Sequence, residues 1–511
     1  MLNKDLFEKL VEKDKEIVIY IHISATLEFD METAGSPSFA EERSVQLALI
    51  SQKIHSLETA DELGSLLEQL GANDDNKEGF GETDFEKALI KRRYITFSRS
   101  KKIPNEFIGR KERALTLAYN AWVKARNNED FGEFAPFLKE VVALEREEAG
   151  YIREECQSLY DALLNLYEEG MSSKKLDKIF GELEPNLVRM VREYSSIEMK
   201  DDFLYRTYDK QKQEKFAMKI LTEMGFDMKR GTLAISEHPF TSTLGSDDIR
   251  ITTRYNDPSV VDPLSSTVHE GGHALYEMGA SSGMIKGTSL GEGASMGFHE
   301  CISRTYENVV LRSKIFWDRY YDEFQALFME NLKDVSKDDF VRAINRVQPT
   351  YIRTNADETT YNLHIILRYT LEKKLIEGEL EVEDLPAEWN KLFHEMFGLE
   401  VKRLAEGCLQ DVHWASGLFG YFPTYGIGNL YSAQINAKLI EDFGGVENYN
   451  RSFADKGILP ITEYLNDHLF KFGGIYTPEK LIKNITGESL DGKYFVSYLD
   501  AKLNDIWPER K

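Results

Sequence analysis

Apolar residues recur at three- and four-residue spacing along most of the chain, and this period predicts α-helices. One pair of such segments begins at Ser44 and another at Phe131. Their Leu, Ile and Phe stripes are expected to face a hydrophobic core. The 13 prolines lie mostly between these segments, as expected if they separate helices. The pattern therefore predicts a mainly helical protein.

Residues 231–255, GTLAISEHPFTSTLGSDDIRITTRY, depart from the helical period. Alternating β-branched residues and a Gly-Ser-Asp turn predict a short hairpin or edge strand there. The chain contains no internal repeat and no low-complexity linker. The simplest architecture is a single domain over residues 1–511, mainly α with one small β-sheet. Its approximate lobes are a helical part, 1–230, and a part with the motifs described below, 231–511.

Charge and cysteine content restrict the partners and the compartment. The 63 basic and 87 acidic residues give a net charge of −24, which would repel phosphate backbones and anionic lipid. Nucleic acid and membrane partners are therefore not expected, and no apolar stretch reaches the roughly 18 residues of a membrane span. The three cysteines lie far apart without C-x-x-C spacing, and the charged N-terminal segment fails as a secretory signal. These features favour the cytoplasm.

The strongest chemical signal is HEGGH at residues 269–273, an H-E-x-x-H motif. His269 and His273 are four residues apart, about 40° around a helix axis, so both imidazoles can bind one tetrahedral metal ion. Glu270 is expected beside the metal, within reach of a water molecule that the metal activates. A solvent-exposed His/Glu pair on a helix is the alternative interpretation.

The helix that carries this motif is predicted to begin with Asp262 as N-cap and Pro263 as its first residue, and to stop at Gly279. Two adjacent glycines inside it are unfavourable, by about 1 kcal/mol each relative to alanine. Gly271 is expected to let a neighbouring helix approach. Gly272 is expected where a side chain would intrude on the floor of a cleft.

A catalytic zinc ion needs a third protein ligand and one open position. Glu292, Glu300 and Glu307 all follow the motif, and Glu300 is preferred because residues 298–302 are otherwise largely apolar and would bury its carboxylate. Arg304 and Glu307 are expected either to support the ligands or to form an ordinary surface ion pair.

A metal-activated water with a carboxylate base hydrolyses acyl bonds, and peptides are the commonest substrates of this arrangement. Whether such an enzyme cuts inside a peptide or at its end depends on a fixed positive group that binds a terminal carboxylate. Arg353 is the best candidate and Arg250 the second, because a guanidinium binds a carboxylate in a bidentate manner. Structural ion pairs are the alternative for both.

Residues 407–429 are rich in aromatic and hydrogen-bonding groups. His413, Tyr421 and Tyr425 can donate hydrogen bonds to the oxyanion that develops during acyl transfer. A packed aromatic loop is the alternative interpretation of this segment.

Several separated motifs together resemble the carboxypeptidase Taq family of metallocarboxypeptidases, with weaker similarity from about Lys15 to Trp507. They are HPF at 238–240, DIRIT at 248–252, HEGGH at 269–273, HE at 299–300, IRTNAD at 352–357, GCLQDVHW at 407–414 and FGYFPTY at 419–425. The resemblance implies a large helical, gluzincin-like body with a deep active-site cleft. It also implies a homodimer that removes C-terminal residues from peptides with broad specificity, using Zn²⁺ or Co²⁺ to activate water.

The resemblance also implies roles for individual residues. It makes His269, His273 and Glu300 the metal ligands, Glu270 the general base, Arg353, Arg250 and Gln410 substrate-binding residues, and His238, His413, Tyr421 and Tyr425 catalytic cleft residues.

The chain departs from the family next to the third ligand. The family continues as H-E-S-Q, whereas this chain has Cys301 and Ile302 after His299 and Glu300. Cys301 is expected to be a small buried residue rather than a reactive thiol. Ile302 lacks the amide of a glutamine, and this loss is expected to weaken the support of the metal site.

Two other functions fit part of the sequence. A helical endo-oligopeptidase would keep the zinc site and need no arginine for the carboxylate. A metal-free peptide-binding relative would need no general base, so Glu270 argues against it.

Overall fold

The computed structural model describes residues 1–255 and 259–508, which fall into two compact units. The first unit comprises residues 1–101, 199–344 and 435–489, and the second comprises residues 102–198, 345–434 and 490–511. Each unit takes segments from both sides of the expected boundary at residue 230. That the whole chain is one domain stays a prediction.

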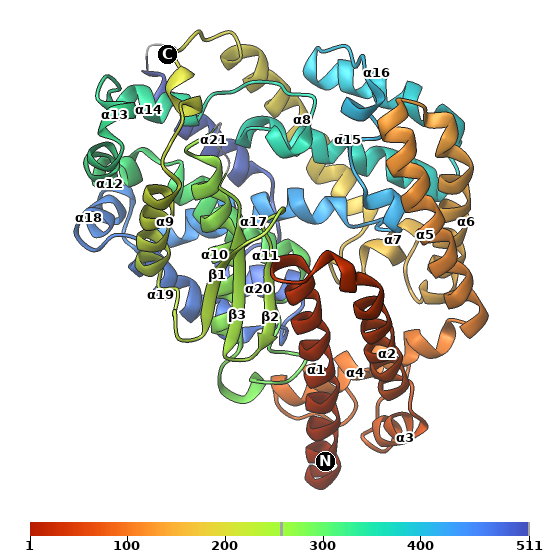
Figure 1. Ribbon diagram of the computed structural model, residues 1–511. Coiled ribbons are helices and arrows are strands. Elements are labelled where there is room, and N and C mark those ends of the chain that lie inside the picture. Colours follow the sequence, from red (N-terminus) through yellow and green to blue (C-terminus); the bar gives the residue numbers. More distant parts are fainter. Residues whose placement is uncertain (256–258, 509–511) are drawn as a thin grey trace. The chain divides into compact units, whose positions relative to one another are not determined.

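The first unit is mostly helical, as the apolar period predicts (Figure 1). Its helices are α1 (Lys4–Thr33), α2 (Ala40–Glu58), α3 (Asp61–Gln69), α4 (Asp84–Lys102, whose last residue belongs to the second unit), α9 (Lys210–Met224), α10 (Asp262–Ala280), α11 (Met296–Arg304), α12 (Lys314–Leu327), α13 (Met329–Leu332), α14 (Lys337–Ile344), α18 (Val446–Lys456), α19 (Leu459–His468) and α20 (Pro478–Thr486).

Within its described residues, the second unit contains helices and connecting loops but no strand. Its helices are α5 (Asn105–Asn128), α6 (Ala135–Ile152), α7 (Leu159–Leu164), α8 (Ser173–Tyr194), α15 (Glu358–Glu377), α16 (Leu385–Phe397), α17 (Phe422–Asp442, which continues into the first unit) and α21 (Lys493–Ile506). Helix α15 forms the centre of this unit, because 15 of its residues are buried.

The predicted small sheet belongs to the first unit. Strands β2 (Thr241–Gly245) and β3 (Asp248–Thr253) form the expected antiparallel hairpin. Strand β1 (Gly231–Ile235) pairs with β3 in parallel, so the strand order is β1-β3-β2. The alternation of the sequence indicated the hairpin, but it did not indicate the parallel third strand. Helix α10 packs against β3, where the Thr267 and Thr253 hydroxyls lie 3.0 Å apart.

The ends of α10 differ slightly from the prediction. The N-cap position is held by Val261, and the Ser259 hydroxyl accepts hydrogen bonds from the Val261 and Asp262 N–H groups. The prediction that Asp262 caps the helix is therefore wrong by one residue. Pro263 lies in the first turn as expected, and the helix continues one residue beyond Gly279 to Ala280.

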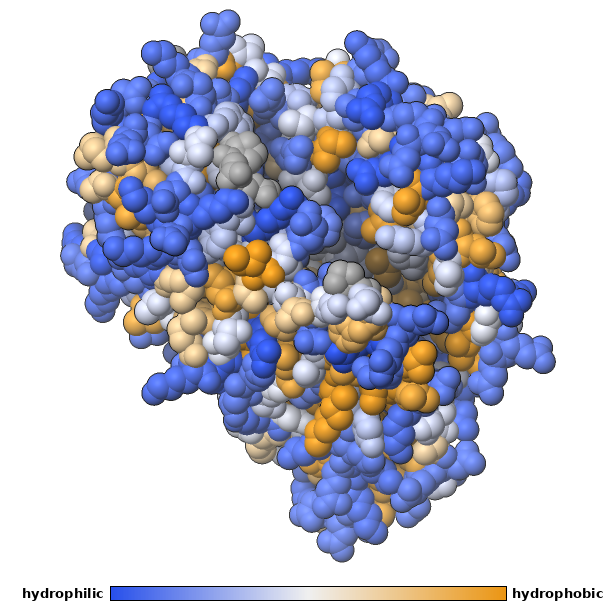
Figure 2. Space-filling view, in the orientation of Figure 1, coloured by the Kyte–Doolittle hydropathy of each residue, from blue (hydrophilic) through white to orange (hydrophobic). Residues whose placement is uncertain are grey.

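The expectation of a core-facing stripe on α2 is wrong for part of the helix. Val45 is 56% exposed and Leu49 is 61% exposed, because α2 packs mainly against α1 within its unit. Figure 2 shows apolar side chains on the face over these two helices, on an otherwise mostly hydrophilic view. The stripe of α6 does face the core, since Leu138 and Val141 are fully buried. Within the described residues, no helix is both long and apolar enough to cross a bilayer.

Candidate functional site

Two helices of the first unit bring three candidate metal ligands together. His269 and His273 come from α10, and Glu300 comes from α11. The Nε2 atom of each histidine lies 3.8 Å from Glu300 Oε2, and one ligand atom from each residue lies within 4.8 Å of the other two. Two imidazole nitrogens and one carboxylate oxygen at this spacing suit a divalent ion with an open fourth position.

The two glycines of α10 allow this convergence. A Cβ on Gly272 would lie 2.8 Å from Ser303 Cα and 3.0 Å from Ile302 O, so Gly272 faces the backbone of α11. The expectation that Gly272 faces the floor of a cleft is therefore wrong. A Cβ on Gly271 would lie 2.5 Å from Leu221 Cδ2, so this glycine lets α9 approach as predicted.

A carboxylate and an arginine support the ligands. His269 Nδ1 lies 2.9 Å from Glu307 Oε2, which fixes the orientation of the ring. Arg304 donates from Nε to Glu300 Oε1 at 2.5 Å and from Nη1 to Glu307 Oε2 at 3.1 Å. The Arg304 and Glu307 side chains are only 13% and 14% exposed, so the alternative of a surface ion pair is wrong. Residues 305–311 form a π-helix, which no sequence pattern indicated, and such helices are frequent at functional sites.

Charge balance accounts for the protonation of these groups. Burial alone would raise the pKa of Glu307, but Arg304 and His269 hold that pKa well below its ordinary value. Burial would lower the pKa of His269, and the neighbouring Glu300 and Glu307 raise it instead. Burial lowers the pKa of His273, which keeps this imidazole neutral and able to bind a metal.

Glu270 lies beside the ligands and is held in place by the sheet. It is 8% exposed, and its Oε2 accepts a 2.6 Å hydrogen bond from the Thr241 hydroxyl of β2. Burial raises the pKa of the Glu270 carboxyl, which makes it a stronger proton acceptor than an exposed glutamate. Thr241 was missed in the sequence, where no spacing links it to the motif.

The two residues that differ from the family pattern after Glu300 lie in the core. Cys301 and Ile302 are both fully buried, as expected for Cys301 as a small core residue. The nearby His299 is a further polar group, and its Nε2 lies 3.0 Å from Glu277 Oε1. Glu277 was missed, although its position one turn after His273 on α10 could have indicated it.

A predicted substrate-binding residue, Arg250, and a predicted catalytic cleft residue, His238, also belong to the first unit. Arg250 makes a bidentate contact with Asp248, from Nε at 2.9 Å and from Nη2 at 2.8 Å, and its guanidinium lies over the ring of Phe29. The structural ion pair expected as its alternative is therefore present. His238 is exposed between β1 and β2, and its carbonyl accepts a 2.5 Å hydrogen bond from Ser236.

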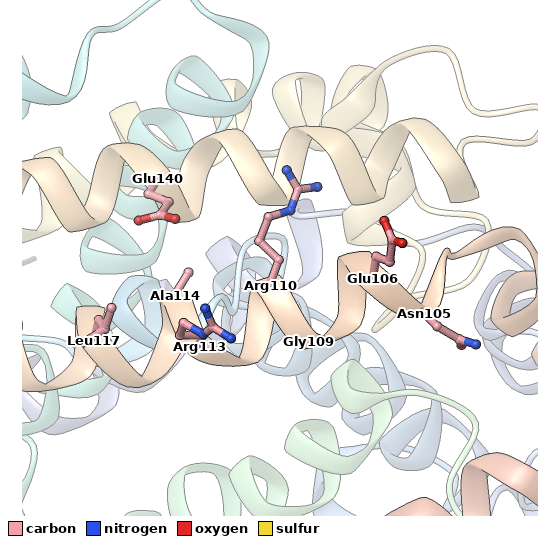
Figure 3. A pocket seen from close by; sticks show the side chains of 8 residues that line it. All are labelled: Asn105, Glu106, Gly109, Arg110, Arg113, Ala114, Leu117 and Glu140. Atoms are coloured by element: carbon pink, nitrogen blue, oxygen red, sulfur yellow. The ribbon is translucent and has the colours of Figure 1, made fainter.

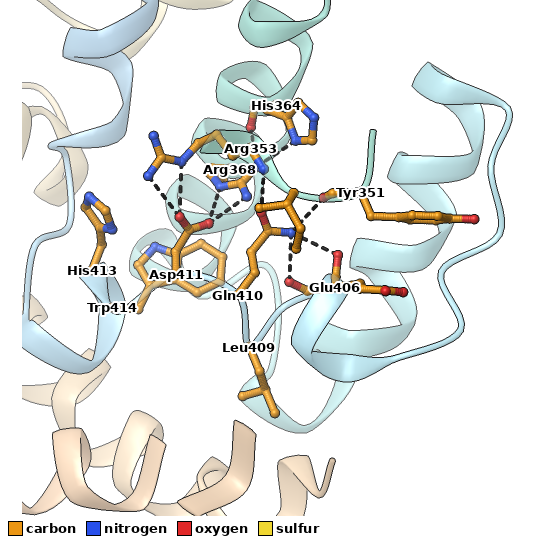
Figure 4. A network of polar contacts seen from close by, with 12 residues as sticks. Tyr351, Arg353, His364, Arg368, Glu406, Leu409, Gln410, Asp411, His413 and Trp414 are labelled. Carbon is orange, nitrogen blue, oxygen red and sulfur yellow. Dashed lines mark hydrogen bonds and ion pairs between the residues drawn. The ribbon is translucent and has the colours of Figure 1, made fainter. Parts of the chain in front are cut away.

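Arg353 belongs to a cluster in the second unit. Its Nε and Nη2 atoms each lie 3.0 Å from Asp411 Oδ1. Arg368 contacts the other oxygen, Oδ2, from Nε at 2.7 Å and from Nη2 at 2.6 Å (Figure 4). Burial would raise the pKa of Asp411, but the two arginines hold it well below its ordinary value. Arg368 was missed in the sequence, since it lies in an ordinary helical stretch.

Gln410 fixes the backbone next to Arg353. Its Oε1 accepts from the Arg353 N–H at 2.9 Å, and its Nε2 donates to the carbonyls of Tyr351 and Glu406 at 3.1 and 2.9 Å (Figure 4). Both ends of the predicted substrate-binding amide thus contact the main chain.

The aromatic candidates lie together in the same unit. His413 Nε2 and the Tyr425 hydroxyl are 3.3 Å apart, and the rings of Tyr421 and Tyr425 pack edge to face with centroids 5.3 Å apart. Burial, with a further contribution from Arg353, lowers the pKa of His413 to about 4. The imidazole is therefore neutral at neutral pH. The expected packed aromatic loop is present, and its hydroxyl and imidazole groups are close enough to act together.

An open groove between α5 and α6 is separate from these candidates (Figure 3). It is lined by Asn105, Glu106, Gly109, Arg110, Arg113, Ala114, Leu117 and Glu140. One of its arginines already has an acidic partner in the same unit, since Arg110 Nη2 lies 2.6 Å from Glu147 Oε1. None of the predicted site residues lines it.

Comparisons with known proteins agree with this chemistry. The family model described as Carboxypeptidase Taq (M32) metallopeptidase matches residues 9–503. Carboxypeptidase 1 of Bacillus subtilis is 36% identical over 510 residues, which are 99% of this chain and 98% of that protein. Thermostable carboxypeptidase 1 of Thermus thermophilus is 34% identical over 511 residues, with 98% and 99% covered.

A solved structure is also similar to this chain over nearly its whole length. The M32 carboxypeptidase from Deinococcus radiodurans has a TM-score of 0.93 and 33% identity, covering 99% of this chain and 100% of that chain. The family model and these relatives span nearly the whole sequence. The chain therefore belongs to the Carboxypeptidase Taq (M32) family of metallopeptidases.

Proposed function

We propose that this chain is a carboxypeptidase that releases C-terminal amino acids from peptides of varied sequence, with His269, His273 and Glu300 as its metal ligands. The convergence of these three side chains beside the buried carboxylate of Glu270 is the observation that carries the proposal. When bound there, a divalent ion supplies a water that is more acidic and more nucleophilic than bulk water.

Glu270 is the proposed general base. Its carboxylate accepts a proton from the attacking water and passes that proton to the amine that leaves. The Thr241 hydroxyl orients one carboxylate oxygen, and burial makes the group more basic. Glu307 accepts a hydrogen bond from the Nδ1–H of His269, which leaves Nε2 without a proton and directed at the ligand position.

The family resemblance supports the proposed substrate-binding residues. We propose Arg353 as the group that binds the terminal carboxylate, with Arg250 and Gln410 as further substrate-binding residues. The proposed contacts to the reacting peptide bond come from His238, His413, Tyr421 and Tyr425. A buried guanidinium over aromatic rings supports the role of Arg353, because its Cζ lies 5.0 Å from the Tyr425 ring centroid.

Zn²⁺ is the proposed metal, with Co²⁺ as the alternative, since two imidazoles and one carboxylate suit both ions. A homodimer is proposed from the family resemblance. A cytoplasmic location is proposed because the three cysteines lie far apart without C-x-x-C spacing, which favours a reducing compartment.

The test is mass spectrometry of peptides incubated with metal-loaded protein, each peptide in a free-acid and a C-terminally amidated form. Stepwise loss of single C-terminal residues from the free acids alone is expected. The Glu270→Gln variant should retain the metal and lose this activity, because its amide cannot accept the proton.

The matched control is Glu395→Gln, the same substitution in an exposed His-Glu pair of α16 that lacks a second histidine. This control should cleave like the wild type. Internal cuts in both peptide forms would instead indicate the endopeptidase, and no cleavage by stably metal-loaded protein would contradict the proposal.

A further inference from the structure

Arg353, Asp411 and Arg368 form a buried ion-pair group, here called the arginine pair, in which two guanidiniums share one carboxylate (Figure 4). Arg353 is 8% exposed, Arg368 is fully buried, and the Asp411 side chain is 13% exposed. Two positive charges face one negative charge, so one positive charge is in excess. A buried charge of this kind is unfavourable unless a partner completes it.

The neighbouring ionisable groups do not remove this excess. Glu372 lies one turn after Arg368 on α15, but its two oxygens accept hydrogen bonds from the Tyr160 hydroxyl, the Trp414 indole N–H and the Gly420 N–H, and burial raises the pKa of its carboxyl to about 8. Burial lowers the pKa values of His364 and His413, so both imidazoles are neutral. The arginine pair therefore keeps a net positive charge.

Only one end of the group can meet a ligand. Arg368 packs its guanidinium over the ring of Trp389 at 4.8 Å and has no exposed surface. Arg353 retains some exposure, and its Nη1 donates to the Tyr361 hydroxyl at 3.0 Å. A guanidinium has five N–H donors on three nitrogens. Each nitrogen of Arg353 already contacts Asp411 or Tyr361, and the remaining N–H groups can donate to a ligand.

Arg368 changes what Arg353 can bind. Paired with Asp411 alone, Arg353 would be neutralised, and Asp411 would compete with a substrate carboxylate for its N–H groups. With Arg368 on the second oxygen, Asp411 is shared between two cations and the group attracts an anion.

We infer that Arg368 is a positioning residue for carboxylate binding: through Asp411 it orients the Arg353 guanidinium and supplies the excess positive charge that holds a peptide's C-terminal carboxylate. This inference rests on the proposed carboxypeptidase function, which it deepens. Arg368 itself touches no substrate.

The test measures binding without catalysis. Metal-free protein is titrated calorimetrically with N-acetyl-phenylalanine and with its amide. The wild type should bind the free acid and not the amide. Arg368→Gln should weaken binding of the acid by about 10- to 100-fold, as expected for a lost charge-assisted contact. In the metal-loaded enzyme, the KM for free-acid peptides should rise by a similar factor while kcat changes little.

Further variants separate charge from structure. Adding Asp411→Asn to Arg368→Gln restores a net positive charge at Arg353 and should recover part of the affinity. The control Arg189→Gln removes another arginine that contacts an aspartate, Asp500, on the surface of the same unit and should bind the acid like the wild type.

Wild-type affinity in folded Arg368→Gln, or failure of the wild type to bind the acid, would overturn the inference. If that variant does not fold, Arg368→Lys is measured, because an ammonium keeps the charge but cannot make both contacts. It should bind several-fold more weakly, and unchanged affinity would also overturn the inference. Arg368-dependent binding by a protein that cleaves no peptide would refute the proposed function alone.

Discussion

The same substitution is expected to have different effects at the two adjacent glycines of α10. Gly272→Ala adds a methyl group that meets backbone atoms of α11, 2.8 Å from Ser303 Cα and 3.0 Å from Ile302 O. Since carbon atoms normally pack at about 3.5 Å or more, the two helices must separate by roughly 0.7 Å at this point. Gly271→Ala meets the end of the Leu221 side chain, which can rotate away.

The energies follow from these contacts. Each substitution gains about 1 kcal/mol of helix propensity. Overpacking against backbone costs about 1–3 kcal/mol, so Gly272→Ala should lower the free energy of unfolding by up to about 2 kcal/mol. Gly271→Ala should change it by less than about 1 kcal/mol. Because Glu300 lies on α11, only Gly272→Ala should displace a metal ligand, and ligand geometry is sensitive to shifts of about 0.2 Å.

Two measurements separate the variants. Urea unfolding of metal-free protein gives the stability difference, and competition with a chromophoric chelator gives the zinc affinity. We expect a loss of zinc affinity of about tenfold or more for Gly272→Ala, comparable with the loss of a group that orients a ligand. Wild-type zinc affinity in Gly272→Ala, or equal losses in both variants, would refute the assignment of Gly272 to the α10–α11 contact.

Three further predictions concern the supporting groups and the surface. Glu307→Gln should lower zinc affinity by about 10- to 100-fold in chelator competition, because it removes the charge that orients His269; unchanged affinity would show that Glu307 has no such role. His413 has a folded-state pKa of about 4, against an ordinary 6.5, so the wild type should lose up to about 3 kcal/mol of stability as the pH falls from 6.5 to 4. Urea unfolding should show that His413→Gln lacks this contribution, and a difference from wild type that is constant across this range would contradict the pKa. Leu49→Ser on exposed α2 should change the free energy of unfolding by less than about 0.5 kcal/mol, whereas Leu367→Ala in buried α15 should lower it by about 2–5 kcal/mol.

Local chemistry in the sequence was enough to indicate part of the site. The spacing of His269 and His273 fixes their common helix face, and the apolar neighbours of Glu300 indicated a buried carboxylate. Gly272 could not be interpreted in the same way, because its role depends on which helix packs opposite it. Arg368 was missed for a related reason: its function arises from a contact with Asp411, 43 residues away, and its own segment reads as ordinary helix. The apolar period predicted the helices but not the exposure of Leu49, since burial depends on what covers a helix.

Both clusters contain buried charge that is not fully compensated within the cluster. The excess charge is negative in the first unit and positive in the second. The first unit has three carboxylates in its cluster, those of Glu270, Glu300 and Glu307. Among the described residues, two arginines, Arg304 and Arg312, contact Glu307, and Arg304 also contacts Glu300. A cation at the histidines completes that cluster. In the second unit, two guanidiniums share one carboxylate, and an anion completes it. Replacing a buried ion pair by hydrophobic residues of similar volume is often neutral or stabilising, so fold stability alone gives little reason for either cluster. The unbalanced charges therefore agree with the proposed ligands, a divalent metal in one unit and a carboxylate in the other.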